Sequence, residues 1–194
     1  MIIVGLTGGM GSGKTTVLKM FERLGAAIYI ADKEAKRLLT TQVKLKEDII
    51  KEFGNLAYIG GKLNRAYLSD IVFGNTHKLK KLNAIVHPAV YDDFKKFISL
   101  CNNKYVIYES AILLQSGNAS MFDYIINVSA PLSIRIDRII RRDKTNEDKI
   151  KLRLQNQEIT DESISKVNFI IENIDLDKTQ QQVLNIHQVF LGEV

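Results

Sequence analysis

The chain has 194 residues, of which 45% are hydrophobic and 25% are charged. That length suits one domain, or one core with a smaller addition, and the composition excludes disordered, collagen-like and coiled-coil chains. With 27 Lys and Arg against 22 Asp and Glu the formal net charge is +5, which suits an anionic small molecule as well as a nucleic acid.

The predicted elements alternate between strands and helices. The first apolar run, residues 2–6, predicts a buried strand, and the helical pattern after the next glycines ends at Gly25. Further continuous apolar stretches predict strands at 27–30, 105–108, 124–128 and 169–171. Such stretches are typical of strands buried on both faces of a parallel sheet. We therefore predict an α/β fold, with a parallel sheet of about five strands flanked by helices and a ligand site at the carboxyl ends of the strands.

The interval between the second and third predicted strands is too long for a single crossover. Residues 32–104 carry several helical patterns, so we predict an inserted helical subdomain. Within it, His87-Pro88 interrupts a helical pattern and predicts a kink or a break, because proline lacks a backbone donor and clashes one turn back. Taken alone, His87 is more often a packing or capping residue than a functional one.

The sequence indicates a cytoplasmic protein without a membrane anchor. No stretch approaches the roughly 18 consecutive apolar residues of a membrane span, and the first residues lack the basic region of a signal peptide. The single cysteine, Cys101, has no partner in the chain for a disulfide, and no Cys/His cluster has zinc spacing. A reducing cytoplasm is therefore the expected compartment.

A glycine-rich motif stands between the first predicted strand and the following helix. Residues 8–15 read GGMGSGKT and satisfy G-x-x-x-x-G-K-[ST], in the strand-to-helix context that makes a chance glycine turn a poor alternative. Its backbone N–H groups and the helix N-terminus would surround phosphate oxygens, with Lys14 on the β/γ-phosphates and Thr15 on Mg²⁺. The predicted triphosphate-binding residues are Gly9, Met10, Gly11, Ser12, Gly13, Lys14, Thr15 and Thr16.

The remaining motifs favour a small phosphotransferase that uses ATP. The sequence contains neither the D-x-x-G and N-K-x-D elements of a GTPase switch nor an ABC-type signature. In a phosphotransferase the loop holds ATP, while other residues position an acceptor and neutralise charge on the transferring group.

Two carboxylates lie at predicted strand ends. Asp32 follows the second strand, where an acceptor hydroxyl beside the phosphate loop would need a base, so we predict that it accepts this proton or helps to hold Mg²⁺ through water. The alternative for Asp32 is a helix N-cap. Glu109 ends the third strand, where it would lie near the metal or, equally, face solvent.

A basic helix is predicted near the end of the sheet region. Over residues 134–143, the 100° rotation per residue gathers Arg135, Arg138 and Arg142 on one face. Arginine binds phosphate oxygens bidentately and stays charged when water is expelled, so this face predicts a lid that closes on the triphosphate. The alternative is a solvated basic face, partly neutralised by neighbouring aspartates.

Four segments, in order and spacing, resemble the dephospho-coenzyme A kinase family: GLTGGMGSGKTT, AAIYIADKEAKRL, LNAIVHP and RIIRRD. The resemblance implies transfer of the γ-phosphoryl group of ATP to the 3′-hydroxyl of dephospho-CoA, giving coenzyme A and ADP. It also implies one P-loop NTPase-type kinase domain over residues 1–194. Its expected parts are a nucleotide-binding core at 1–31, 105–131 and 158–194, an acceptor-binding subdomain at 32–104 and a lid at 132–157.

The resemblance also implies roles for single residues. Asp32 matches the catalytic carboxylate of the family, His87 and Pro88 match its His-Pro pair beside the acceptor, and Arg138 and Arg142 match its lid arginines. Lys14, Asp32 and Arg142 are thus the expected catalytic residues. Thr15 is the expected Mg²⁺ contact, with Asp32 and Glu109 as further candidates. Gln157 and Asn173 are weaker candidates for contacts on the nucleotide side.

Three positions depart from the family pattern. Ile30 replaces the first acid of the usual D-A-D, and Gln115 replaces the acid that ends a P-L-L-F-E-like stretch, so neither can supply an anionic contact. Asn168 stands where an aspartate often precedes the last strand.

The sequence leaves two alternative functions possible. One is a P-loop kinase of another nucleoside or nucleotide acceptor, and the other is a nucleotide-binding regulatory module. Nucleic-acid binding is disfavoured, because the basic excess is small and aromatic residues make up only 8% of the chain. We expect ATP and dephospho-CoA as partners, with no nucleic acid, no membrane and no obligate protein partner.

Overall fold

The structure is a computed structural model that describes residues 1–115, 119–144 and 164–193. The chain divides into two compact units, each of which is described by itself. The first, named here the sheet unit, comprises residues 1–29 and 102–194. The second, the helical unit, comprises residues 30–101. The part of the chain that the structure describes contains no helix long and apolar enough to cross a bilayer.

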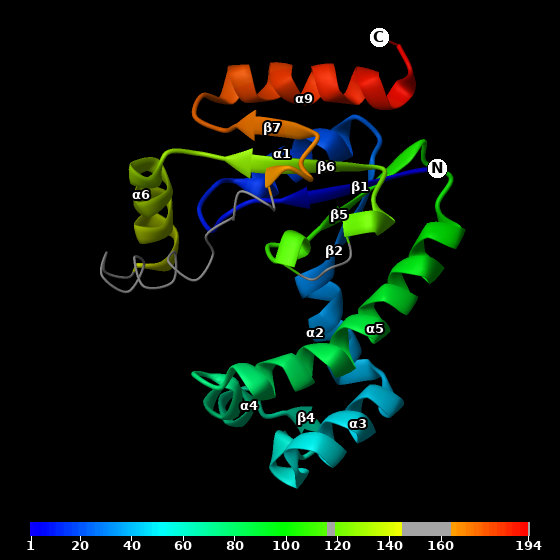
Figure 1. The fold of residues 1–194 in the computed structure, drawn as a ribbon, viewed down its shortest axis with the longest axis vertical. Coiled ribbons are helices and arrows are strands. Elements are labelled where there is room, and N and C mark those ends of the chain that lie inside the picture. Colours follow the sequence, from blue (N-terminus) through cyan, green and yellow to red (C-terminus); the bar gives the residue numbers. More distant parts are fainter. Residues whose placement is uncertain (116–118, 145–163, 194) are drawn as a thin grey trace. The chain divides into compact units, whose positions relative to one another are not determined.

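A five-stranded sheet forms the centre of the sheet unit (Figure 1). Its order is β2-β5-β1-β6-β7, and the β1–β5, β1–β6 and β6–β7 pairs are parallel. The strands are β1 (Ile2–Thr7), β2 (Ala27–Ile30), β5 (Tyr105–Glu109), β6 (Tyr124–Ser129) and β7 (Phe169–Glu172). This confirms the predicted α/β class and places every predicted strand.

The register of the sheet brings the carboxyl ends of its strands to one edge. Leu6 of β1 is opposite Glu109 of β5, Thr7 is opposite Asn127 of β6, and Ser129 is opposite Glu172 of β7. Polar residues that follow these strands therefore share the edge at which open α/β sheets bind ligands.

Among the described residues, this sheet is accompanied by the helices α1 (Lys14–Arg23), α6 (Leu132–Asp143) and α9 (Leu176–Leu191). Two short 3-10 helices, Leu113–Gln115 and Ala119–Met121, follow β5. Helices α1 and α9 pack against each other, and their aromatic residues meet a strand residue in the core. The ring of Tyr105 lies 6.3 Å from that of Phe21 and 5.2 Å from that of Phe190, so apolar faces of both helices are buried here.

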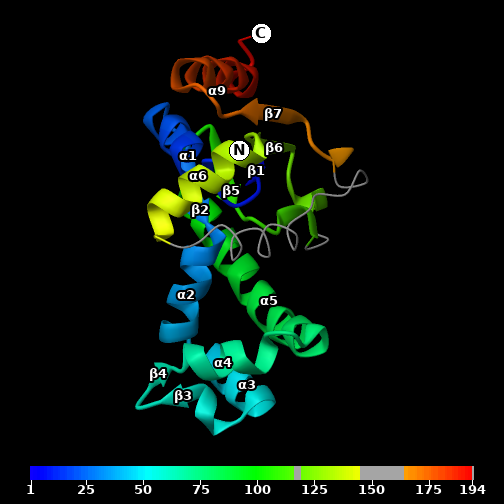
Figure 2. The ribbon, with the colours of Figure 1, turned by 90° about the vertical axis from the view of Figure 1, so that its left-hand side faces the viewer.

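The helical unit is built around one long helix, α5 (Thr76–Leu100). Helices α2 (Ala31–Thr41), α3 (Val43–Phe53) and α4 (Arg65–Val72) pack against it. A 3-10 turn (Asn55–Ala57) leads into the short strands β3 (Tyr58–Ile59) and β4 (Lys62–Leu63), visible in Figure 2 beside α4. The core of this unit consists of buried Ile49, Phe53, Ala57, Tyr58 and Leu68.

Pro88 lies inside α5 and does not end it, so the break allowed by the sequence prediction is wrong. Proline removes only one intrahelical hydrogen bond, whereas the turn that follows is held by Val90 and Phe94, which are 4% and 1% exposed. The α5 ribbon changes direction along its length in Figure 1, which agrees with the predicted kink.

Candidate functional site

The glycine-rich loop, residues 8–13, connects the carboxyl end of β1 to the first turn of α1. Gly11 and Gly13 have φ values of 81° and 94°, in the left-handed region that only glycine adopts without strain. Gly13 occupies the N-cap position of α1 and has no side chain that could cap the helix. The start of α1 is therefore presented to a ligand in the way that suits an anion.

A pocket of about 320 Å³ lies between this loop and α6. Its lining combines loop backbone, cationic side chains and one hydroxyl group. The lining residues are Met10, Gly11, Gly13, Lys14, Thr15, Ala111, Arg138, Ile139 and Arg142. The pocket lies entirely within the sheet unit and has the positive lining that a polyphosphate requires.

Lys14 is held at this pocket by one group of the loop and one group at the end of β5. Its Nζ donates a hydrogen bond to the Gly8 carbonyl oxygen at 2.8 Å and lies 3.9 Å from Glu109 Oε1. The Glu109 side chain is only 12% exposed, so the solvent-facing alternative for this residue is wrong. Because β1 and β5 are paired in register at Leu6 and Glu109, the strand end delivers the carboxylate beside the loop.

The three arginines of the predicted basic face have different partners. Arg135 Nε donates to the Met10 carbonyl oxygen at 2.9 Å, and Arg138 Nη1 donates to the Ser12 carbonyl oxygen at 3.2 Å. Burial lowers the pKa of Arg135 from its usual value. A fully solvated basic face therefore does not describe Arg135 and Arg138.

Arg142 is the most exposed of these arginines, with 63% of its side chain accessible. It forms a bidentate pair with Asp143, in which Nε and Nη2 donate to the two carboxylate oxygens at 2.7 and 3.0 Å. This pairing raises the pKa of Arg142. Arg142 also lines the pocket, so its guanidinium has a carboxylate partner at the mouth of an anion site.

The residues predicted for the acceptor lie in the helical unit. Asp32 is exposed in the first turn of α2, and Ile30 is the N-cap residue, so the N-cap alternative for Asp32 is wrong. His87 is half-buried in α5, where desolvation lowers its pKa and favours the neutral imidazole at pH 7. Pro88 is its exposed neighbour. Their roles stay predictions.

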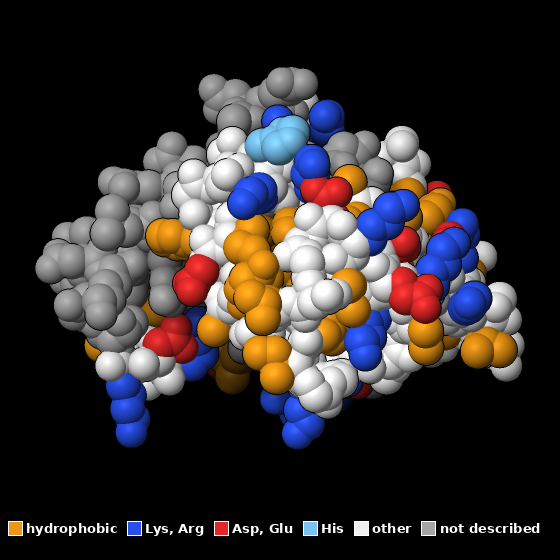
Figure 3. Space-filling model, turned by 90° about the horizontal axis from the view of Figure 1, so that it is seen from below, with side chains coloured by type: hydrophobic (Ala, Val, Ile, Leu, Met, Phe, Trp, Pro, Cys, Tyr) orange, Lys and Arg blue, Asp and Glu red, His pale blue; other side chains and the backbone are white. Residues whose placement is uncertain are grey.

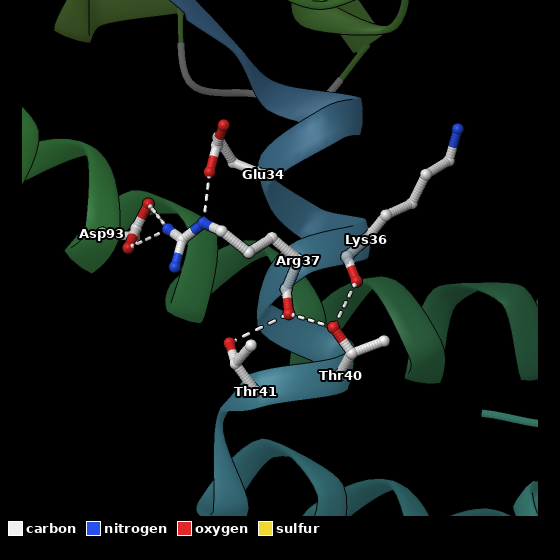
Figure 4. A network of polar contacts seen from close by, with 6 residues as sticks. All are labelled: Glu34, Lys36, Arg37, Thr40, Thr41 and Asp93. Carbon is white, nitrogen blue, oxygen red and sulfur yellow. Dashed lines mark hydrogen bonds and ion pairs between the residues drawn. The ribbon is translucent and has the colours of Figure 1, made fainter. Parts of the chain in front are cut away.

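A polar clip that the sequence reasoning missed joins the two helices that carry these residues (Figure 4). Arg37 of α2 donates from Nη2 to both carboxylate oxygens of Asp93 on α5, at 2.6 and 2.7 Å. Its Nε also donates to Glu34, and the two carboxylates raise the pKa of Arg37. The clip fixes α2, with Asp32 in its first turn, against α5. Arg37 and Asp93 are separated by 56 positions, so local spacing contained no signal for it.

Asn173 lies just after β7 and is only 4% exposed. Its Nδ2 donates to the Ser12 carbonyl oxygen at 2.8 Å, and its Oδ1 accepts from the Thr179 hydroxyl at 3.2 Å. Asn173 therefore contacts the backbone of the phosphate loop. Gln157, the other weak candidate, lies outside the described residues, as does the second half of the predicted lid.

The departures from the family pattern have local explanations in part. Asn168 Oδ1 accepts from the Ile125 backbone N–H at 2.8 Å, which ties the start of β7 to β6, and an amide oxygen serves there as well as a carboxylate. Gln115 is an exposed residue at the end of a 3-10 helix. Ile30 is the last residue of β2, and nothing in the structure explains the change from an acid.

The donor atoms at and beside the pocket determine whether it can hold a metal ion. Residues 1–115, 119–144 and 164–193 hold no group of three or more His, Cys, Asp or Glu side chains suited to a metal ion. Mg²⁺ bound with a nucleotide takes most of its ligands from phosphate and water and needs only one or two from protein. The Thr15 hydroxyl at the pocket and the Glu109 carboxylate beside Lys14 supply a donor set of that kind.

Comparison with known proteins gives consistent matches over nearly the whole chain. A family model described as dephospho-CoA kinase matches residues 2–178. A dephospho-CoA kinase of Fusobacterium nucleatum is 37% identical over 174 residues, covering 89% of this chain and 90% of that protein. One of Bacteroides fragilis is 35% identical over 173 residues, covering 89% and 84%.

Solved structures agree with these matches. A Thermus thermophilus protein has a TM-score of 0.87 at 27% identity, covering 98% of this chain and 97% of its own. A dephospho-CoA kinase from Campylobacter jejuni has a TM-score of 0.70 at 26% identity, covering 99% and 98%. A shikimate kinase from Acinetobacter baumannii, at 17% identity and a TM-score of 0.54, covers 99% and 94% and shares the fold alone.

Proposed function

The chain belongs to the dephospho-CoA kinase family, and we propose that it transfers the γ-phosphoryl group of ATP to the 3′-hydroxyl of dephospho-CoA, giving coenzyme A and ADP. The observation that carries this proposal is the pocket in which the loop backbone, Lys14, Arg138 and Arg142 converge. A pocket with this lining is suited to a triphosphate, and the family membership supplies the acceptor.

On the nucleotide side, residues 9–16 hold the phosphates of ATP. Backbone N–H groups of the loop and the start of α1 bind the phosphate oxygens, and Lys14 neutralises charge on the β- and γ-phosphates. Arg138 and Arg142 line the same pocket from α6. When ATP enters, Arg142 turns from the Asp143 carboxylate to the phosphoryl oxygens, where it stabilises charge that grows in the transition state.

On the acceptor side, the helical unit holds dephospho-CoA. Asp32 accepts the proton of the 3′-hydroxyl as its oxygen attacks the γ-phosphorus, and the bond from that phosphorus to the bridging oxygen of ADP breaks. His87, in its neutral form, and Pro88 lie beside the acceptor. The clip between Arg37 and Asp93 keeps α2 and α5, the helices that carry these groups, in a fixed arrangement.

Magnesium accompanies ATP as its counter-ion. Thr15 and Glu109 are the protein groups that would hold it, with Asp32 as a further contact through water. The ion supplies neutralisation of phosphate charge. Lys14 and the arginines of α6 complete that neutralisation from the protein.

Two further proposals concern the cellular compartment of the protein and the kind of molecule that it binds. The single cysteine supports a reducing cytoplasm as the compartment. Figure 3 shows one face of the molecule on which, among the described residues, Lys and Arg are interspersed with Asp and Glu. Binding of nucleic acid favours a continuous basic surface, so this face supports a protein that acts on small molecules.

The test is ADP release by the purified protein with Mg-ATP, comparing dephospho-CoA with AMP, adenosine, cytidine and no acceptor. We expect release with dephospho-CoA alone, together with coenzyme A identified by mass. Equal release with another acceptor would overturn the substrate assignment, and release without any acceptor would favour a simple ATPase.

A further inference from the structure

The phosphate loop is held on its outer side by two side chains that do not line the pocket, Arg135 and Asn173. The Arg135 guanidinium donates to the carbonyl oxygen of Met10, and the Asn173 carboxamide donates to that of Ser12. The residues that line the pocket include Gly11 and Gly13 but neither of these two donors. These two contacts act on the loop through residues that do not line the pocket, although the Ser12 carbonyl also accepts from Nη1 of the pocket-lining Arg138 at 3.2 Å.

The direction of a carbonyl fixes the direction of the next amide. In a planar trans peptide, the C=O of one residue and the N–H of the following residue point in opposite directions. A Met10 carbonyl held toward Arg135 therefore directs the Gly11 N–H away from Arg135, and a Ser12 carbonyl held toward Asn173 directs the Gly13 N–H away from Asn173. Both glycines line the pocket, and amides directed in this way would be available to an anion bound there.

Glycine allows these donors to approach the loop. A Cβ atom added at Gly13 would lie 1.9 Å from Asn173 Nδ2, and one added at Gly9 would lie 2.3 Å from Arg135 Nη2. Any side chain at either position would displace the donor. These glycines thus serve the outer contacts in addition to the phosphate turn itself.

The backbone of Asn173 is anchored independently of the loop. Its N–H donates to the Ser129 carbonyl at the end of β6, and its Oδ1 lies 3.2 Å from the hydroxyl of the buried Thr179, whose nearest acceptor is the Asp175 carbonyl at 2.6 Å. From this anchored position Nδ2 donates to the Ser12 carbonyl at 2.8 Å. The sheet therefore positions this donor beside the loop.

We propose that Asn173 and Arg135 are positioning residues that act through the carbonyls of Ser12 and Met10, directing the amides of Gly13 and Gly11 toward the phosphates of the nucleotide. This rests on the proposed function only in taking a nucleotide as the ligand. It differs from the sequence expectation that Asn173 contacts the nucleotide, and it separates Arg135 from the pocket-lining Arg138 and Arg142.

The test uses Asn173→Leu, which keeps the approximate size of the side chain but removes the donor without adding charge. The matched control is Asn103→Leu, because Asn103 Nδ2 donates to the Gly25 carbonyl at 2.8 Å before β5, at the opposite edge of the sheet. Loss of one hydrogen bond should weaken ADP binding by about three- to tenfold in Asn173→Leu and leave it unchanged in the control. Asn173→Ala, which has a smaller side chain, is measured as well. If Asn173→Leu fails to fold, Asn173→Ala still tests the loss of the donor.

A second readout separates positioning from general loss of stability. In protein labelled with ¹⁵N-glycine, ADP should shift the Gly11 and Gly13 amide protons downfield, and Asn173→Leu should reduce the Gly13 response while Gly11 responds as before. Arg135→Gln should give the reverse pattern. Arg135→Gln also removes a positive charge, which by itself weakens binding of an anion. For this variant the amide shifts, and not the ADP affinity, therefore test the proposal.

Equal responses of both glycines in the variants, or ADP affinity of Asn173→Leu within twofold of wild type, would overturn the proposal. These measurements need no acceptor. An enzyme that binds ADP as described but fails to phosphorylate dephospho-CoA would refute the proposed function alone, and normal turnover with unaltered amide responses would refute the positioning role alone.

Discussion

At the scale of single residues, the arginines of α6 show what sequence spacing can and cannot reveal. Helical periodicity places Arg135, Arg138 and Arg142 on one face, and the structure brings the last two to the pocket. The carbonyl partners of the first two lie more than a hundred positions away, at Met10 and Ser12, and only the folded chain brings them together. Periodicity therefore predicted the face but not its partners.

Asp32→Asn should lower kcat by about a hundredfold or more, because the amide cannot accept the proton of the acceptor hydroxyl. ADP affinity should stay within about twofold of wild type, since Asp32 is not among residues 9–16, which are proposed to hold the phosphates. Steady-state turnover assays measure kcat, and titration with ADP measures the affinity. Asp48→Asn, an exposed acid on α3, is the control. Unchanged kcat in Asp32→Asn would end the assignment.

Arg142→Ala should slow the single-turnover phosphoryl transfer by about a hundredfold, because it removes a charge that acts on the transferring group. The KM for dephospho-CoA should change little. The free energy of unfolding of the Arg142→Ala variant should also change little, since an exposed ion pair such as Arg142–Asp143 contributes at most about 1 kcal/mol. Arg141→Ala is the neighbouring control, and a transfer rate equal in both variants would argue against the role.

At the scale of elements, the sequence predicted the sheet but missed small structures in the helical unit. The five strands were visible because each is a continuous apolar run, although in β7 Ile170 is exposed and only Ile171 is fully buried. The β3–β4 hairpin has strands of two residues, too short for a periodic pattern. Its turn was nevertheless signalled by Gly60-Gly61, whose φ values of 56° and 79° suit a two-residue hairpin turn. Of the kink or break predicted at Pro88, the break did not occur, because tertiary packing kept α5 continuous, and the direction of the helix changes along its length.

The start of α5 offers a test of local stability. Asn75 caps this helix, since its Oδ1 accepts from the Lys78 backbone N–H at 3.0 Å. Asn75→Ala should lower the free energy of unfolding by about 1 kcal/mol and Tm by about 2–4 °C. Asn75→Ser retains an acceptor oxygen and should recover most of the loss. Thermal unfolding followed by circular dichroism measures both, and equal Tm values for Ala and wild type would show that the cap contributes nothing.

At the scale of the whole molecule, the candidate residues are divided between two units. The residues proposed to bind ATP lie in the sheet unit, and those proposed for the acceptor, Asp32, His87 and Pro88, lie in the helical unit. The length of the interval between two predicted strands indicated an inserted subdomain. Its internal packing, including the clip between Arg37 and Asp93, depends on contacts that no local pattern encodes.

Hydrogen exchange with each ligand alone should separate these roles. ADP should slow amide exchange in residues 8–16 and in α6, because it binds the loop and the arginines beside it. Dephospho-CoA should slow exchange in α2 and around His87 in α5. Mass spectrometry of peptides from the exchanged protein reads both patterns. Protection by dephospho-CoA confined to the sheet unit would contradict the acceptor assignment, while the ADP pattern provides the internal control.

The hydrogen bonds that Arg135 and Asn173 make to loop carbonyls also bear on the entropy of nucleotide binding. Fixing the backbone of one residue costs about 1–2 kcal/mol at 25 °C, so ordering two peptide units on binding would cost about 2–4 kcal/mol. We infer that this ordering accompanies folding, because both contacts join residues within the sheet unit. The proposed phosphate site would then bind as a rigid template, without the cost of a disorder-to-order transition.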